Sequence, residues 1–259
     1  MTIKRASRRR IGYKFVVRVR SPAWLLPIAI LAFACGGGLG GVVKTPKPVT
    51  ASTQLTPDLG SLVFSDDFND PESGWSRDSS GDFNASFAKS GYTIVARGLV
   101  DHEVAAPYTT PKDQLSVAVT ATESSSSPNG SGFGAACDRG ITDPTVSYDF
   151  AVAVGGIWEL VRHDLRPGAT TQHSLLKKGT SPKAPGANSL TIELMCATLS
   201  DGVTTRLVMY INSTQVGDIT DAVSNLPRLG WLGGLVVRSQ DSGPTTVTAT
   251  HFEERDLTF

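Results

Sequence analysis

The chain has 259 residues and 40% hydrophobic content, which is enough for one sizeable core. Its formal net charge of zero hides an asymmetry, because eight of its 24 basic residues lie in the first twenty positions, which contain no acid. The rest of the chain holds 16 basic and 24 acidic residues, a net charge of about −8. A mildly acidic domain argues against nucleic acid as a partner.

The chain begins with a basic segment, residues 1–20, followed by an apolar or Gly-rich run without charge, residues 21–43. This order is typical of a bacterial membrane-targeting segment, because cationic residues stay in the cytoplasm while the apolar run enters the bilayer. The 23-residue run reaches the ~20 residues that a spanning helix requires. We therefore expect an N-terminal membrane helix in a bacterial cell membrane, with the remainder of the chain on the extracytoplasmic side.

Two other fates of this segment stay open, besides the alternative that it is a buried core helix. The stretch "LAFACGGG" resembles a bacterial lipobox, with Ala34 before Cys35 and glycines after it, so Cys35 is a lipidation candidate. Ala32 and Phe33 depart from the residues that a lipobox usually has. The segment can also be a signal that is cleaved and released, and "SRRRIG" resembles a twin-arginine export signal.

Residues 44–60 are rich in Pro, Thr and Ser and lack hydrophobic periodicity, which predicts an extended linker between membrane and domain.

The remaining residues, 61–259, contain short runs with period-two alternation or β-branched enrichment, separated by clusters of turn-forming residues. So many strands without helices to supply parallel crossovers predict an all-β fold, with two antiparallel sheets packed face to face as a jelly-roll sandwich. The predicted strands are Leu62–Phe64, Ala85–Ala88, Tyr92–Arg97, Glu103–Pro107, Leu115–Glu123, Gly132–Asp138, Val146–Val154, Trp158–His163, His173–Leu176, Leu190–Cys196, Thr205–Asn212, Thr214–Asp218, Gly230–Val237 and Thr246–Glu253.

Alternation within these strands indicates which side chains face the core. One predicted strand places Leu115, Val117, Val119 and Ala121 on one face, and another does so with Leu207, Met209 and Ile211. Large aromatic side chains are normally buried, so we expect Trp75, Phe133, Trp158 and Trp231 to pack in the core or at a sheet edge.

The order of these motifs resembles the concanavalin A-like lectin/glucanase superfamily, near its bacterial laminin G-like and 3-keto-disaccharide hydrolase-like groups. The resemblance runs from about Leu62 to the C-terminus. It rests on "LVFSDDFNDPESGW", "SGYTIVAR", "SGFGAACDRG", "VSYDFAVAVGGIWELVRHD", "NSLTIELMCATLSDGVTTRLVMYINSTQVGDITD", "GWLGGLVVRS" and "VTATHFEERDLTF" in that order. The chain departs from the family at "HFEERD", where many members have Asp-Asn-Phe, so no role is transferred to that position.

The resemblance places Cys137 and Cys196 on strands that can be neighbours, and in an oxidising exterior such a pair predicts a disulfide. Two separate buried thiols are the alternative. Zinc binding at these cysteines is not expected, since neither has a second Cys or His at metal-ligand spacing.

No catalytic residue is predicted. A retaining glucanase on this fold needs two nearby carboxylates, typically supplied by Glu-x-Asp-x-x-Glu, and the chain lacks this motif. Asp149, Glu159 and Glu193 are isolated acids within predicted strands, which favours solvated outward positions. The histidines lack a nucleophile motif such as Gly-x-Ser-x-Gly.

The stretch "SDDFNDPESGW", residues 65–75, holds four carboxylates. We interpret it mainly as a turn that ends a first strand pairing near the last, with Phe68 and Trp75 as packing anchors. A calcium ion held by Asp66, Asp67 or Asp70 is the alternative, although the calcium-loop spacing is absent. No other cofactor is expected.

Tyr148, Trp158, Arg162 and His163 are the ligand-binding candidates, since they offer aromatic rings and hydrogen-bond donors of the kind that a sugar uses. Ordinary alternation on an exposed strand is the alternative. The sequence thus favours a membrane-tethered, non-catalytic module that recognises glycans or a cell-wall component. A glycoside-processing enzyme with acids from separate strands, and a protein-interaction or sensory ectodomain, are the alternatives.

Overall fold

The computed structural model describes residues 57–107, 110–139, 146–169, 171–181, 188–226 and 230–258. The basic segment, the 21–43 segment with Cys35 and most of the 44–60 linker lie outside these residues. Within the described ranges no helix is long and apolar enough to cross a membrane.

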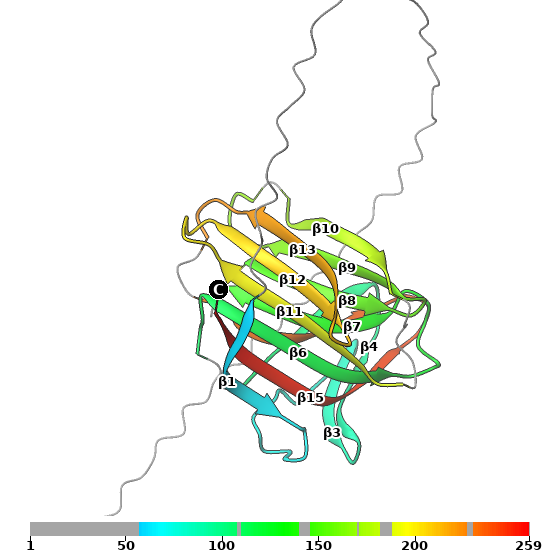
Figure 1. Ribbon diagram of the computed structural model, residues 1–259. Helices are drawn as coiled ribbons and strands as arrows, with labels where there is room; N and C mark the ends of the chain where they lie inside the picture. The colour runs from blue at the N-terminus through cyan, green and yellow to red at the C-terminus, as the bar shows by residue number, and fades with distance from the viewer. Residues whose placement is uncertain are drawn as a thin grey trace, which may run out of the picture.

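The described residues form fifteen β-strands and contain no helix (Figure 1). Each strand predicted from the sequence overlaps an observed one, and only the three-residue β2 was not anticipated. The strands are β1 Asp58–Asp66, β2 Asp78–Ser80, β3 Phe83–Ala88, β4 Gly91–Ala96, β5 Val100–Ala105, β6 Gln114–Glu123, β7 Gly132–Arg139, β8 Val146–Ala153, β9 Ile157–Asp164, β10 His173–Thr180, β11 Leu190–Thr198, β12 Thr204–Ile211, β13 Thr214–Ala222, β14 Leu232–Ser239 and β15 Thr245–Thr258.

The strands make two antiparallel sheets, which confirms the predicted all-β fold with two sheets. Sheet A has nine strands in the order β13-β12-β11-β6-β15-β4-β3-β2, with β1 also paired to β15. Sheet B has six strands in the order β10-β9-β8-β7-β14-β5. Figure 1 shows sheet A in front of sheet B, so the two sheets are stacked face to face.

The core lies between the sheets and follows the alternation seen in the sequence. Leu115, Val117, Val119 and Ala121 of β6 and Leu207, Met209 and Ile211 of β12 are all buried in it. The four aromatic residues predicted to pack, Trp75, Phe133, Trp158 and Trp231, are at most 4% exposed and belong to the same cluster.

A disulfide between Cys137 and Cys196 joins the two sheets, as the resemblance implied. Cys137 lies on β7 of sheet B and Cys196 on β11 of sheet A, with their Cα atoms 6.5 Å apart. Both residues are fully buried. The covalent link closes a loop spanning 59 positions, which in the chain-entropy picture stabilises the fold by about 4 kcal/mol.

The outer side of β7, away from the core, lies unusually close to β8. A Cβ atom on Gly134 would be 1.8 Å from the carbonyl oxygen of Phe150, and one on Gly132 would be 2.2 Å from that of Val152. The residue between them, Phe133, is buried in the core, so these glycines face outward. Only glycine fits such an approach, and we infer that sheet B is bent toward its outer side here.

Candidate functional site

Two of the four predicted ligand-binding residues are buried in the core. Tyr148 is 0% and Trp158 is 4% exposed, and both pack within the main hydrophobic cluster. The ring of Tyr148 lies 5.4 Å from that of Trp231, and the ring of Trp158 lies 5.9 Å from that of Phe150. Neither residue presents a ring face to solvent, so stacking on a sugar does not involve them.

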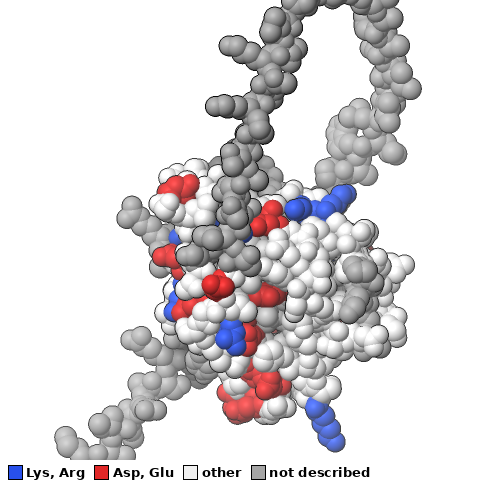
Figure 2. All heavy atoms as spheres, viewed as in Figure 1, with Lys and Arg blue, Asp and Glu red and all other residues white. Residues whose placement is uncertain are grey.

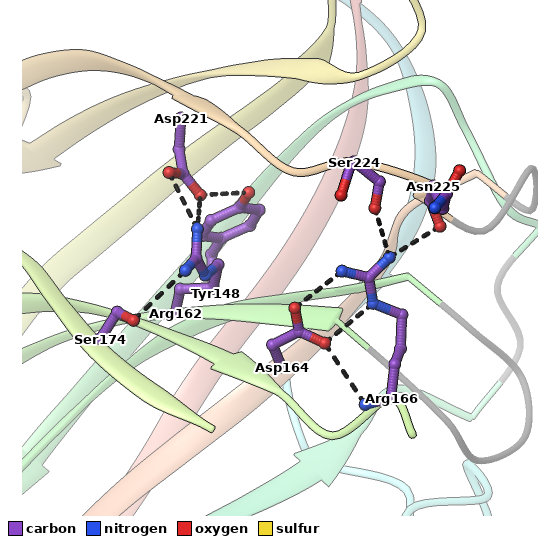
Figure 3. A network of polar contacts seen from close by, with 8 residues as sticks. All are labelled: Tyr148, Arg162, Asp164, Arg166, Ser174, Asp221, Ser224 and Asn225. Carbon is purple, nitrogen blue, oxygen red and sulfur yellow. Dashed lines mark hydrogen bonds and ion pairs between the residues drawn. The ribbon is translucent and has the colours of Figure 1, made fainter. Parts of the chain in front are cut away.

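Arg162 and Tyr148 hold β13 against sheet B. Arg162 Nη1 donates hydrogen bonds to both carboxylate oxygens of Asp221, at 3.0 and 2.9 Å, and the hydroxyl of Tyr148 donates to Oδ2 at 2.9 Å (Figure 3). Beside them, Arg166 is paired with Asp164 and donates to the backbone carbonyls of Ser224 and Asn225 (Figure 3). These groups bridge the two sheets and have a structural role.

His163 lies apart from the other three candidates, on the outer face of sheet B. Positions alternate along β9, so Trp158 and Arg162 face inward while Glu159 and His163 face outward. Nε2 of His163 is 3.0 Å from Oδ2 of Asp149 on the neighbouring strand β8. Nδ1 of His163 lies 2.7 Å from Nδ1 of His173 on β10. The structure thus places one predicted binding residue in a polar cluster that the sequence did not reveal.

This cluster belongs to a surface that we call the hollow, the outer face of sheet B. Small residues and two valines cover its middle, and charged residues from β5, β7, β8, β9 and β14 surround them. Its members are Asp101, Glu103, Gly132, Gly134, Ala136, Asp138, Asp149, Ala151, Glu159, Val161, His163, Gly234, Val236 and Arg238.

The hollow is strongly concave, as the distances across it show. Asp101 lies on β5 and His163 on β9, four strand spacings apart, which would be about 19 Å in a flat sheet. Yet ligand atoms of Asp101, Asp149 and His163 all lie within 4.8 Å of one another. The side chains of an aspartate and a histidine are too short to span the difference, so the sheet itself must curve around this point.

Arg238 of β14 connects the two rims of the hollow. Its Nε and Nη2 donate to the carboxylate of Asp101 at 3.0 and 3.3 Å, and its Nη1 donates to Oε2 of Glu159 at 2.6 Å. Glu159 lies on β9, three strands away from β14. On the two strands between them, Gly132 of β7 pairs with Arg238 and Ala151 of β8 pairs with Glu159, and neither has a side chain long enough to obstruct the guanidinium.

The polar groups of the hollow shift one another's pKa values. Burial alone would lower the pKa of His163, but the carboxylates of Asp149 and Asp101 outweigh burial and raise it above the ordinary value. Burial lowers the pKa of His173, and the charge of His163 lowers it further. Burial also raises the pKa of Glu103 well above its usual range, and the negative charges of Asp138 and Asp149 add to this effect. The hollow thus raises the pKa of one imidazole, His163, and of one carboxyl, Glu103.

One end of the hollow opens into a cavity of about 740 Å³. Asp101, Glu159 and Arg238 line it, together with residues from the β6–β7 and β8–β9 connections, among them Asn129 and Gly155. This volume lies within the range of small-molecule binding sites. The cavity therefore gives a ligand access to the charged residues of the hollow.

The carboxylates of residues 65–75 stabilise the turn that this stretch forms. Asp66 accepts hydrogen bonds from the backbone N–H of Phe68 (2.6 Å) and from Nε1 of Trp75 (3.0 Å). Asp70 accepts one from the N–H of Glu72 (2.8 Å), and Asp67 lies 2.6 Å from Nδ1 of His251. Figure 2 shows acidic side chains gathered at this lower end of the molecule. The calcium reading at Asp66, Asp67 and Asp70 stays untested, although each carboxylate already has a protein partner.

The packing role predicted for this stretch is confirmed. Phe68 is 2% and Trp75 is 3% exposed, their ring centroids are 5.2 Å apart, and β1 pairs with the last strand, β15. Phe68 adopts a positive φ of 56°, a conformation that the hydrogen bond from its N–H to Asp66 supports.

Sequence reasoning missed two buried acids, Glu123 and Glu254. Glu254 is fully buried on the core side of β15 and accepts a hydrogen bond from the N–H of Gly233 at 2.9 Å. Glu123 accepts one from the hydroxyl of Ser131 at 2.6 Å. Burial raises the pKa of each carboxyl to about 7. The sequence did contain a signal for the burial of Glu254, because this residue lies two positions after Phe252 and therefore on the same face of the strand.

No family model matches the sequence, and no curated protein matches it. The fold, however, is similar to that of solved structures. An endo-1,3-β-glucanase from Streptomyces sioyaensis superposes with a TM-score of 0.53 at 13% identity, over 80% of this chain and 100% of the glucanase chain. An endo-acting O-glycanase of the human gut microbiota gives 0.54 at 11% identity, over 76% and 100% of the two chains.

A Bacillus subtilis protein with a galectin-like fold and unknown function is similar to the same degree, with a TM-score of 0.53 at 10% identity, over 78% of this chain and 99% of that one. Together these likenesses show the concanavalin-like β-sandwich fold. At such low identity they transfer no activity. The laminin G-like and hydrolase-like groups remain predictions.

Proposed function

We propose that the chain is a membrane-tethered, extracytoplasmic β-sandwich module that binds glycan in the hollow of sheet B without catalysing a reaction. The observation that carries the proposal is the cavity of about 740 Å³ whose lining includes Asp101, Glu159 and Arg238. Fixed carboxylates accept hydrogen bonds from sugar hydroxyls and a guanidinium donates them. The similar structures named above as a glucanase and an O-glycanase support a glycan as the ligand.

The membrane tether is proposed from the sequence of residues 1–60. The basic segment 1–20, the apolar segment 21–43 and the linker 44–60 would place the sandwich outside the cytoplasm. The disulfide supports this location, because such bonds persist in oxidising compartments. Whether residues 1–34 are removed and Cys35 is acylated can be read from the intact mass of the membrane-extracted protein.

The absence of catalysis is proposed from the residues of β8. Asp149 occupies the outer face of this strand, and the next positions on the same face are Ser147 and Ala151. This strand therefore offers no second carboxylate beside Asp149, as the Glu-x-Asp-x-x-Glu arrangement would.

A specific distance favours glycoside hydrolysis as the second candidate. Carboxylate oxygens of Asp101 and Asp149 lie within 4.8 Å, close to the ~5–5.5 Å between the catalytic carboxyl groups of retaining glycosidases. This arrangement matches the reading of an enzyme with acids from separate strands. A screen against disaccharides and their 3-keto derivatives tests it, with Asp149→Asn as the variant. Turnover by the wild type that this variant loses would replace the non-catalytic proposal.

Retention on immobilised polysaccharides tests the proposed function. The full-length, detergent-extracted protein is passed over a panel of cell-wall and plant polysaccharides. We expect delayed elution on at least one of them and no soluble product. Elution with the void volume from every gel would contradict glycan binding and would favour the protein-interaction alternative.

A further inference from the structure

We propose that the hollow also binds a divalent transition-metal cation, held by Asp101, Asp149 and His163. One oxygen or nitrogen atom from each of these residues lies within 4.8 Å of the others, so a small closing movement of the side chains would let a single ion contact all three. The residues come from three different strands, β5, β8 and β9. Their convergence depends on the curvature of sheet B and is not a by-product of neighbouring positions in the sequence.

The second observation is an unpartnered oxygen on Asp149, a member of this cluster. Asp149 is 3% exposed, and its Oδ2 lies 3.0 Å from His163. Its Oδ1 is buried and has no hydrogen-bond partner among the residues that the structure describes. A buried carboxylate oxygen without a partner costs free energy, and a bound cation would remove this cost.

The surroundings orient the ligands as metal sites require. His163 would use Nε2 for the metal, while Nδ1–H would donate to Nδ1 of His173, 2.7 Å away. Metal-binding histidines usually donate their other N–H in this manner, which fixes the ring. Arg238 similarly holds the carboxylate of Asp101 through Nε at 3.0 Å. Each of the three ligands thus lies on a strand. Two of them, His163 and Asp101, are also held by a partner side chain.

The donor set indicates the class of cation. Two carboxylates and one imidazole suit Zn²⁺ or a neighbouring transition metal, whereas Ca²⁺ prefers six to eight oxygens. Three protein ligands leave a coordination position open, as in catalytic zinc sites. One of the three ligands, Asp101, also lines the cavity.

Calorimetric titration of the metal-stripped, full-length protein with Zn²⁺, without any sugar, tests the proposal separately from glycan binding. We expect one saturable site per chain. Asp149→Asn should weaken it at least about tenfold, since even outer partners of metal ligands change affinity by 10–100-fold. The matched control is His251→Gln, which removes another histidine paired with an aspartate, Asp67, but on sheet A. This control should keep the wild-type affinity.

The absence of saturable Zn²⁺ binding, or equal affinities of wild type and Asp149→Asn, would overturn the proposal. If Asp149→Asn fails to fold, X-ray absorption of the zinc-loaded wild type decides. The expected spectrum contains one imidazole with oxygen ligands and no sulfur. A spectrum without imidazole, or with two or more, would place the ion elsewhere.

Discussion

His163 and Asp149 face each other on neighbouring strands of sheet B, with Nε2 of the imidazole 3.0 Å from Oδ2 of the carboxylate. His173 contacts the other ring nitrogen at 2.7 Å, so the imidazole is fixed from both sides. Both members of the pair are largely buried, their side chains being 13% and 4% exposed. The polar groups of the hollow are therefore in place before a ligand arrives, which lowers the entropic cost of binding.

Gly134→Ala tests the curvature that forms the hollow. The new methyl would meet the carbonyl oxygen of Phe150 at 1.8 Å, and neither backbone can yield without breaking the β7–β8 pairing. We expect the free energy of unfolding, measured with urea, to fall by about 1–3 kcal/mol, as for other overpacked sites. Gly81→Ala is the control, because nothing lies within 4 Å of its added Cβ. Equal stabilities of the two variants would contradict the proposed close approach.

Tyr148→Phe separates structure from ligand binding. The ring faces the core and its hydroxyl donates to Asp221, so the change leaves the packing intact and removes one hydrogen bond to a carboxylate. We expect stability to fall by about 1–2 kcal/mol. Glycan retention should not change. A clear loss of glycan retention with unchanged stability would instead show that Tyr148 contacts the ligand.

Removal of the disulfide tests the link between the sheets. The double variant Cys137→Ser, Cys196→Ser should lower the free energy of unfolding by about 4 kcal/mol, because the unfolded chain regains the freedom of the 59-position loop. Denaturation of wild type with and without reductant provides the same comparison without mutation. If neither the double substitution nor the reductant lowers the free energy of unfolding, the presence of the disulfide is contradicted.

The buried carboxyl of Glu254 should make the free energy of unfolding fall as pH rises. Burial raises the pKa of its carboxyl from 4.5 to about 7, so between these values the folded protein binds a proton that the unfolded chain has lost. The contribution is therefore complete below pH 4.5 and is lost as pH rises through 7, in total about 3 kcal/mol. Glu254→Gln keeps an oxygen for the N–H of Gly233 and should remove this part of the pH dependence.

Urea denaturation between pH 5 and 8 measures the effect. Glu123, whose pKa is likewise about 7, should leave a residual slope in the variant. The matched control is Glu253→Gln, since Glu253 pairs with Arg255 outside the core. If Glu254→Gln and wild type show the same slope, Glu254 does not hold its proton in the folded state.

The architecture could be predicted because it depends on local pattern. In β6, apolar residues at every second position from Leu115 to Ala121 indicated one buried face, and all four are buried. Turn clusters marked the ends of strands. The Cys137–Cys196 pair depended instead on the family resemblance, because the sequence gives no distance between β7 and β11.

The site was harder to predict because it depends on curvature across the sheet. Tyr148, Trp158 and Arg162 were grouped with His163 although the alternation of β9 already separates Arg162 from His163. Nothing in the local sequence connects Asp101 with Asp149, which lies three strands away in the sheet. A usable signal was present in β7, where Gly132, Gly134 and Ala136 keep one face free of large side chains.

The affinity of an oligosaccharide from the best-retained polysaccharide, measured for Glu159→Gln and for Glu193→Gln, tests the central claim most directly. Glu159 lines the cavity of the hollow, whereas Glu193 lies on sheet A, where the hydroxyl of Ser116 donates to it at 2.6 Å. Glycan binding in the hollow predicts about tenfold weaker binding for Glu159→Gln, the loss of one charge-assisted hydrogen bond, and wild-type affinity for Glu193→Gln. Unchanged affinity in Glu159→Gln with a loss in Glu193→Gln would place the ligand on the opposite sheet and contradict the account.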